Sequence, residues 1–173
     1  EVFDAVREDP SSLLQWTSSE LLADPEILSS IKEDADIDSL AAFASLLLHS
    51  SVEVRAAAVE AIEDLAVKGN HHALSSVVAC LGDEHEVVRR ALVELLPRLV
   101  EKGDRHAIAE TSAHFAHGDA GARSAAVEAL GRVAEVGDQQ AVIAFRELLV
   151  DSCPDVRRAA REALRAMGAW DEV

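Results

Sequence analysis

Aromatic side chains are scarce in this chain, and tyrosine is absent. Phe and Trp make up 3% of the 173 residues, although the hydrophobic share of the chain reaches 49%. A core with so few aromatics must be filled by Ala, Leu, Val and Ile, which suit closely packed helices better than sheets. The composition therefore predicts an all-α fold.

Basic residues are also in short supply. Lys and Arg number 16 against 32 Asp and Glu, so the formal net charge is −16 at pH 7. Nucleic acids and anionic membrane surfaces are negatively charged and would repel such a chain. No apolar run approaches the roughly 18 residues that a bilayer span needs. We therefore expect no nucleic-acid partner and no membrane insertion.

A period of 34 residues runs through the sequence. Its clearest marker is a column of arginines at Arg55, Arg89, Arg123 and Arg157. Self-similarity at such a period is typical of solenoids, whose stacked units cover one another's apolar faces. The register predicts a repeat domain over 36–173, with units at about 36–69, 70–103, 104–137 and 138–171. Residues 1–35 lie outside this register and are expected to form a short helical N-terminal cap.

Each unit is expected to contain two helices, named helix A and helix B. Helix A starts at a column of good N-cap residues, which are Asp36, Asn70, Asp104 and Asp138. Glycine precedes three of these caps, at Gly69, Gly103 and Gly137, and marks where the previous helix B ends in a left-handed turn. Apolar spacing predicts helix A at about 13 residues and helix B at about 16. The inward columns are Leu40, Leu74, Ile108 and Val142; Leu47, Leu81, Phe115 and Leu149; Val54, Val88, Ala122 and Val156; and Ile62, Leu96, Leu130 and Leu164, with small residues at Ala57, Ala91, Ala125 and Ala159.

The helix-B segments resemble HEAT repeats, and most closely the HEAT-like repeats named after phycobilisome lyases. These segments are VRAAAVEAI (54–62), VRRALVELL (88–96), ARSAAVEAL (122–130) and VRRAAREAL (156–164). The resemblance implies a right-handed α-solenoid of antiparallel helix pairs, of the HEAT/armadillo-like kind. It also implies a non-catalytic scaffold for protein–protein interaction, or a subunit of a larger assembly. The lyase subtype implies an alternative, a factor that assembles a light-harvesting complex or loads its chromophore.

In such repeats an Asp typically accompanies the Arg six residues later. Asp83 with Arg89 and Asp151 with Arg157 fit this pattern, and His49 and His117 hold the Asp position in the other two units. We expect each arginine to bond the carboxylate or the turn carbonyls of its own or the next unit, and so to form a structural ladder that fixes repeat stacking. The alternative is a row of arginines that faces a ligand anion. The ladder predicts a larger loss of stability on removing Arg89 or Arg157 than on removing Arg55 or Arg123.

The exposed face of helix B is the predicted partner-binding surface. Its candidate residues are Glu53, Glu60, Glu63, Asp64, Glu94, Arg98, Glu128, Arg132, Arg158 and Glu162. The acidic first unit would suit a basic segment of a protein partner. The alternative is a solvated face whose charges pair within each helix at i,i+4 spacing, as Glu94 with Arg98, Glu128 with Arg132 and Arg158 with Glu162.

Seven histidines suggest a metal site or an enzyme, but their spacing argues against both. His72 and His106 share a column, and stacked helices about 10 Å apart are too far apart for two imidazoles to hold one ion. Metal-dependent hydroxylases that resemble this fold use several His-Glu pairs, whereas here His85-Glu86 is a single pair. We therefore predict no metal, no cofactor and no enzymatic activity, with a metal-dependent hydroxylase as the remote alternative.

The two cysteines are expected to be free thiols. Cys80 and Cys153 lie two units apart, which at about 10 Å per stacked helix pair exceeds disulfide reach. Free thiols favour a reducing intracellular compartment, the cytoplasm, or a plastid if the lyase resemblance carries over. Glu1 is expected to be a cloning boundary or an end left by processing of a precursor.

Overall fold

The computed structural model describes residues 43–65 and 71–169, and all regular structure in these ranges is helical. The elements are α5 (Val52–Leu65), α6 (His71–Ala79), η2 (Cys80–Gly82), α7 (Glu86–Leu99), α8 (Arg105–Ala113), η3 (His114–Ala116), α9 (Ala120–Val133), α10 (Gln139–Glu147), η4 (Leu148–Val150) and α11 (Pro154–Ala166). The predicted N-terminal cap, the N-cap residues Asp36 and Asn70, the inward Leu40 and the turn glycine Gly69 lie outside the described residues.

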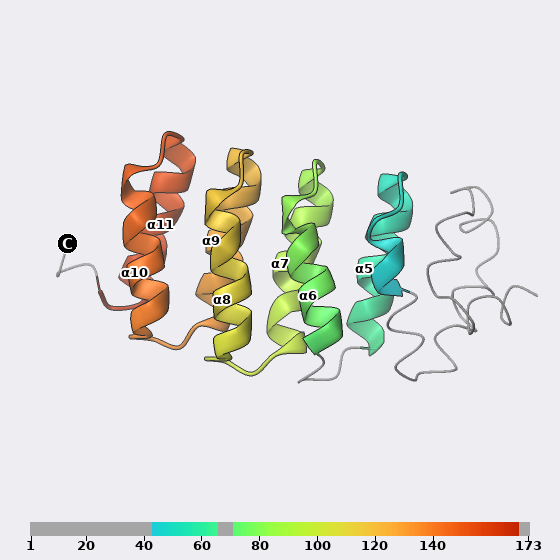
Figure 1. Ribbon diagram of the computed structural model, residues 1–173, viewed down its shortest axis with the longest axis horizontal. Helices are drawn as coiled ribbons and strands as arrows, with labels where there is room; N and C mark the ends of the chain where they lie inside the picture. Colours follow the sequence, from blue (N-terminus) through green and yellow to red (C-terminus); the bar gives the residue numbers. More distant parts are fainter. Residues whose placement is uncertain (1–42, 66–70, 170–173) are drawn as a thin grey trace, which may run out of the picture.

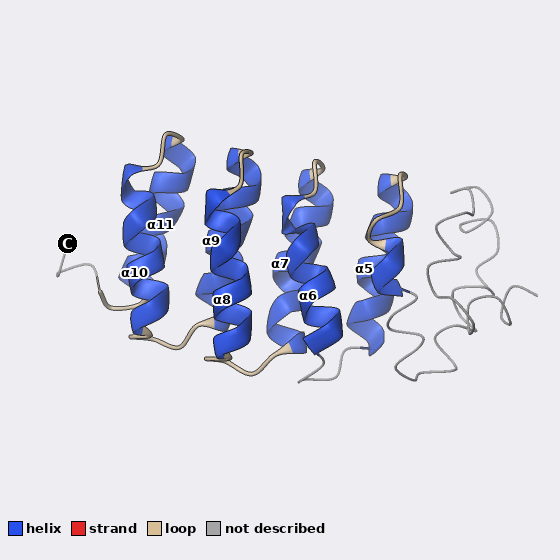
Figure 2. Cartoon of the chain, viewed as in Figure 1, coloured by secondary structure: helices blue, strands red, loops and turns tan. Residues whose placement is uncertain are grey.

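The helices stand side by side in chain order, in a row that runs from α5 to α11 (Figure 1). Helices B form one layer, in which α7 packs against α5 and α9, and α9 also packs against α11. Helices A form the other layer, in which α8 contacts both α6 and α10. The turn inside each helix pair lies at one end of the molecule, and the connection to the next pair lies at the other end (Figure 2). This arrangement confirms an all-helical, solenoid-like fold.

The predicted starts and stops of helix A are confirmed where the structure describes them. Asp104 Oδ1 accepts hydrogen bonds from the amides of His106 and Ala107, both at 2.9 Å. Asp138 Oδ1 accepts from the amide of Ala141 at 2.9 Å. The glycines before these caps have left-handed backbones, with φ of 84° at Gly103 and 83° at Gly137. An N-cap carboxylate after a left-handed glycine thus separates one helix pair from the next.

Both helices are shorter than the sequence predicts. In each described helix A, nine α-helical residues are followed by a three-residue 3₁₀ turn. The turn tightens because the amide of the following residue bonds the carbonyl three residues back, as from Asp83 to Cys80 at 3.0 Å. Helix B runs for 14 residues in α5, α7 and α9 and for 13 in α11.

The core consists mainly of aliphatic side chains from both layers. Of the predicted inward columns, all described members are buried except Leu149, which is partly buried beside the buried Leu148. Of the predicted small residues, Ala125 is buried, Ala91 and Ala159 are partly buried and pack against the core, and Ala57 is partly buried. The next column is completely buried, at Ala58, Leu92, Ala126 and Ala160.

One core position holds a polar group without a partner. Thr111 on α8 is completely buried, and its Oγ1 forms no hydrogen bond with any described residue. The same column holds Phe43, Val77 and Phe145, which are buried apolar residues. A buried hydroxyl without a partner costs free energy on folding.

Replacing Thr111 with Val should therefore stabilise the protein. Thr111→Val exchanges the hydroxyl for a methyl of similar size, so the free energy of unfolding should rise by about 1 kcal/mol. Urea unfolding followed by circular dichroism would measure the change. The control is Thr111→Ser, which keeps the hydroxyl, loses a methyl and should lower stability. A loss of stability in Thr111→Val would show that the hydroxyl has a partner.

Candidate functional site

The four arginines of the 34-residue column all bond their own inter-helix turn. Each Nη1 donates to the carbonyls six and five residues earlier in the chain. In Arg55 the acceptors are the carbonyls of His49 at 2.8 Å and Ser50 at 3.1 Å. Equivalent pairs of bonds occur at Arg89, Arg123 and Arg157, with distances from 2.6 to 3.1 Å. The guanidinium thus satisfies carbonyls that no helix ladder reaches.

Two of these arginines also bridge to the next helix pair. Arg55 forms a bidentate ion pair with Asp83, at 2.6 Å from Nε and 3.0 Å from Nη2. Arg123 holds Asp151 in the same way, at 2.7 and 2.8 Å. All four side chains are at most 10% exposed. We name each of these bidentate ion pairs a clamp; one joins α5 to the turn before α7, and the other joins α9 to the turn before α11.

The carboxylate pairing predicted from sequence is wrong. Asp83 was expected to pair with Arg89 and Asp151 with Arg157, but each carboxylate binds the arginine 28 residues earlier. The reason is geometric, because Nη1 is held by the carbonyls of its own turn. The Nε and Nη2 edge then points to the following helix pair, and a carboxylate can reach this edge only from there. The predicted order of destabilisation is therefore reversed.

Histidine takes the place of aspartate in alternate turns and makes the same local bond. Asp83 Oδ1 accepts from the amide two residues later at 2.8 Å, and Asp151 does so at 2.7 Å. In His49 and His117 the acceptor is Nδ1, at 3.0 and 3.1 Å. A nitrogen that accepts carries no proton, so both imidazoles are in the tautomer with hydrogen on Nε2. Histidine therefore retains the turn cap, but it offers no carboxylate to a preceding arginine.

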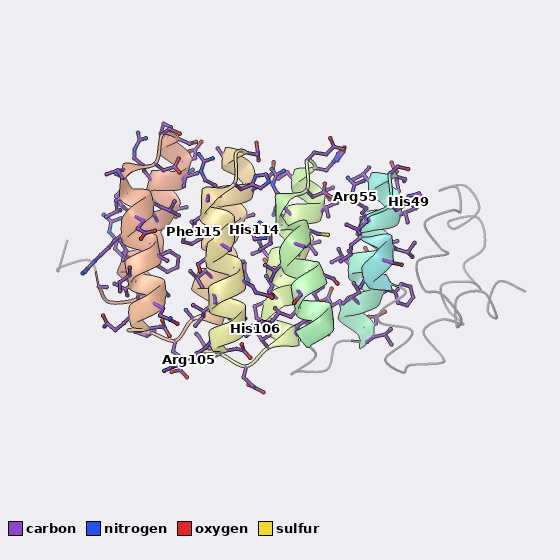
Figure 3. The ribbon with its side chains drawn as sticks, in the orientation of Figure 1. His49, Arg55, Arg105, His106, His114 and Phe115 are labelled. Carbon is purple, nitrogen blue, oxygen red and sulfur yellow. The ribbon has the colours of Figure 1, made fainter. Side chains whose placement is uncertain are left out.

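The junction between α7 and α9 has no clamp as a result. His117 stands there, and its ring packs against the preceding turn, since a Cβ at Gly82 would lie 3.0 Å from Nε2. Arg89 reaches over the start of α9, where a Cβ at Gly121 would lie 2.5 Å from Nη2. Figure 3 shows the turn end of the molecule, with His49 and Arg55 labelled, opposite Arg105 and His106.

Charges on the exposed side of helices B pair across helices more than within them. Arg98 pairs with Glu63 of the preceding helix B, and Arg132 pairs with Glu94 at 2.6 and 2.8 Å. Arg158 binds Asp155 at 2.9 Å, three residues earlier. The predicted pairs of Glu94 with Arg98, Glu128 with Arg132 and Arg158 with Glu162 are therefore wrong. Neighbouring helices B lie close enough for these long side chains to meet.

The remaining predicted residues of this face are exposed acids. Glu60, Glu128 and Glu162 form no ion pair with another described residue, and Asp64 is exposed as well. Glu53 accepts a hydrogen bond from Ser51 Oγ at 2.5 Å. The helix-B face, meaning the exposed side of α5, α7, α9 and α11, thus has cross-paired charges with free carboxylates between them.

A groove of 570 Å³ opens on the helix-B face above the start of α9. Its lining comes from α7, from α9, which contributes mostly small residues, and from the start of α11. The lining residues are Glu86, Arg89, Arg90, Val93, Ala120, Gly121, Ser124, Ala125, Glu128, Cys153 and Asp155. A second hollow beside it is lined by Glu86, Val87, Arg90, Ala91 and Glu94. Glu94 and Glu128 are the predicted partner-binding residues that line these hollows.

Sequence reasoning missed the groove and Arg90, although it singled out Arg89 as a member of the arginine column. The sequence signal for the groove is a smaller residue at a position of the 34-residue register where neighbouring units have a larger one. Gly121 stands where α7 and α11 have Val87 and Asp155. Ser124 likewise stands where those helices have Arg90 and Arg158. A glycine and a serine about one turn apart on the same face leave the volume that the groove occupies.

The described histidines act mainly in turns and packing. His85 Nδ1 lies 3.0 Å from Arg55 Nη2, so it accepts from the guanidinium of a clamp. His106 Nε2 lies 3.2 Å from Glu110 Oε1. Among the described residues no group of three His, Cys, Asp or Glu side chains could hold a metal ion. Cys80 and Cys153 are free thiols, and burial raises the pKa of Cys80 to about 11, which keeps it protonated.

These features define a helical repeat protein with a solenoid-like stack and a hollowed helix-B face. Residues 99–173 match the family model described as HEAT repeats, which covers α8 to α11 and the clamp between Arg123 and Asp151. The match supports the HEAT-repeat family, whose members commonly mediate protein–protein interaction. No curated protein matches the chain. In the part of the chain that the structure describes, every helix is too short or too polar to cross a bilayer.

The clamp predicts unequal effects of two equivalent arginines. Arg123→Ala and Arg157→Ala each remove two bonds to turn carbonyls, but only Arg123→Ala also breaks a bidentate ion pair and leaves a poorly solvated carboxylate. Arg123→Ala should therefore lower the free energy of unfolding by about 2 kcal/mol more than Arg157→Ala. Chemical denaturation of the two variants measures the difference. Asp151→Asn, which keeps the turn acceptor but removes the charge, should fall between them, and equal losses in the two alanine variants would contradict the clamp.

His114 predicts a dependence of stability on pH. Burial, together with the neighbouring His117, lowers the pKa of His114 below its ordinary 6.5. The unfolded chain therefore binds a proton here at higher pH than the folded chain does. The stability that neutral His114 contributes is present above pH 6.5 and is lost as the pH falls through the folded-state pKa.

His114→Leu should flatten this dependence. Leu46 and Leu148 occupy the same column, so leucine fits the site. Unfolding free energies at about pH 7.5 and about pH 5 should differ less in the variant than in the wild type. Thermal unfolding in matched buffers gives the comparison, and an unchanged difference would place the pH dependence at other groups.

Proposed function

We propose that the protein is a non-catalytic interaction module that binds another protein through its helix-B face. The proposed architecture is a right-handed solenoid of antiparallel helix pairs, with four 34-residue repeats over residues 36–171 and a helical cap over 1–35. It works without a cofactor, in a reducing compartment that suits two free thiols. The phycobilisome-lyase subtype and the chromophore-loading alternative remain predictions from resemblance.

The observation that carries this proposal is the hollowed helix-B face. Two adjoining hollows lie along α7 and α9, and Val87 at their edge is 59% exposed. Hollowed surfaces are typical of partner binding by repeat proteins, and protein interfaces combine an apolar centre with a polar rim. The cross-helix ion pairs of Arg98 and Arg132 hold the long side chains in place, so the face presents a preorganised surface to a partner.

The chemistry of the partner follows from the free acids of this face. Glu60, Glu128 and Glu162 recur at 34-residue intervals or multiples of them and are exposed. The arginines of the same face are largely engaged with other carboxylates. A row of free carboxylates on a chain of net charge −16 favours a partner segment rich in Lys and Arg. Nucleic acid is repelled by the same charge.

Charge reversal on this face should abolish partner binding without unfolding the chain. Glu60→Lys combined with Glu162→Lys removes two free carboxylates outside the groove. It also places two positive charges on the face, and these repel a basic partner. Affinity capture from a lysate with quantitative mass spectrometry would measure the loss, with circular dichroism to confirm folding. The matched control is Glu135→Lys with Glu147→Lys, which makes the same charge change at exposed positions away from helices B. Equal capture by both double variants would show that the partner binds elsewhere.

A further inference from the structure

Arg89 has a guanidinium edge that Arg55 and Arg123 use to bind a carboxylate and that Arg89 does not use in this way. In Arg55 and Arg123, Nε and Nη2 hold a carboxylate in a bidentate ion pair. Within the described residues Arg89 donates only through Nη1, to the carbonyls of Asp83 and Glu84. The Nε and Nη2 edge of Arg89 therefore holds no carboxylate in a bidentate ion pair within the described residues.

The local sequence directs this edge to the groove. His117 occupies the position from which Asp83 and Asp151 reach their arginines. Arg89 lines the groove and lies so close over Gly121 that a Cβ there would be 2.5 Å from Nη2. Any other residue at Gly121 would displace the guanidinium. The hydrogen bond that Asp119 accepts from the Ala122 amide, as a helix cap, is the main cause that lowers the pKa of Asp119, and the charge of Arg89 contributes to the same shift.

Arg90 adds a second guanidinium to the same wall. It is exposed, lines both hollows, and forms no ion pair with any described residue. Glu86, Glu128 and Asp155 complete the charged rim of the groove. Three carboxylates around two arginines disfavour a small free anion such as phosphate, because the rim repels it. The same rim favours an acidic side chain that arrives with basic neighbours.

We propose that this groove anchors an Asp or Glu side chain of the partner protein, carried within a basic segment. The acidic side chain takes the place at Arg89 and Arg90 that Asp83 and Asp151 take in the clamps. Flanking Lys or Arg residues of the segment pair with Glu86, Glu128 and Asp155. The inference rests on the proposed function and specifies the chemistry of the partner at one site.

Selection from a random peptide library tests the anchor. A phage-displayed library of random peptides, panned on the full chain at low salt, should yield segments that combine Lys or Arg with an Asp or Glu. Fluorescence anisotropy with one such labelled peptide then compares the wild type with Arg90→Gln. We expect about tenfold weaker binding in Arg90→Gln, because a charge-assisted hydrogen bond in the groove is lost.

Two controls locate the effect. Arg105→Gln removes the same charge at an exposed position of α8, at the opposite end of the molecule from the turns, and should change affinity less than twofold (Figure 3). Replacing the acidic residue of the peptide by its amide should weaken binding to the wild type about tenfold and binding to Arg90→Gln hardly at all, since the two changes remove one interaction.

The outcomes separate this inference from the proposed function. Peptides that lose affinity with Glu60→Lys and Glu162→Lys but bind Arg90→Gln as tightly as the wild type would overturn the anchor and leave the helix-B face as the binding surface. Peptides that are indifferent to all of these variants, or a library without binders, would overturn both. The anchor would also be overturned if Arg90→Gln weakened binding equally for the acidic peptide and for the peptide with the amide.

Discussion

A guanidinium that bonds two carbonyls of its own inter-helix turn is the interaction on which the rest of this structure depends. It occurs at all four arginines of the 34-residue column. The bonds satisfy carbonyls at the point where helix A stops, and they fix the angle at which helix B begins. They also hold the side chain in one orientation, so in Arg55, Arg89 and Arg123 the second edge faces the following helix pair. The neighbour then decides whether that edge becomes a clamp or stays open.

The alternation of Asp and His at the turn makes the junctions of the stack chemically different. Both residue types cap the turn, because an imidazole Nδ1 and a carboxylate oxygen accept the same amide. Only the carboxylate can also neutralise a preceding arginine, so clamps join α5 to α7 and α9 to α11. Between α7 and α9 the exposed ion pair of Arg132 with Glu94 remains, and a pair in that setting contributes at most about 1 kcal/mol. Apolar packing therefore holds this middle junction together.

Features that depend on local chemistry could be predicted from the sequence. The period, the caps at Asp104 and Asp138, the left-handed glycines and nearly all of the inward columns are local, because each follows from neighbouring residues in one helix. The partners of the charged side chains could not be predicted in this way. Spacing at i,i+4 predicted ion pairs within helices. Instead, Arg132 pairs with Glu94 of the neighbouring helix B, and Arg123 pairs with Asp151 of the next helix pair. Linear spacing says nothing about how closely neighbouring helices approach.

The groove shows why the middle junction is suited to recognition. An Asp at position 117 would place a carboxylate where Arg89 could hold it, and a bidentate pair of this kind contributes about 1.5–3 kcal/mol. A larger residue at Gly121 or Ser124 would fill the hollow. The chain forgoes stabilisation at His117, Gly121 and Ser124. These three positions lie within a stretch of eight residues at the same junction. Structural demands alone do not account for this coincidence, since the junctions of α5 with α7 and of α9 with α11 fill the same positions. A site that keeps an arginine edge and a cavity for a partner side chain accounts for all three positions.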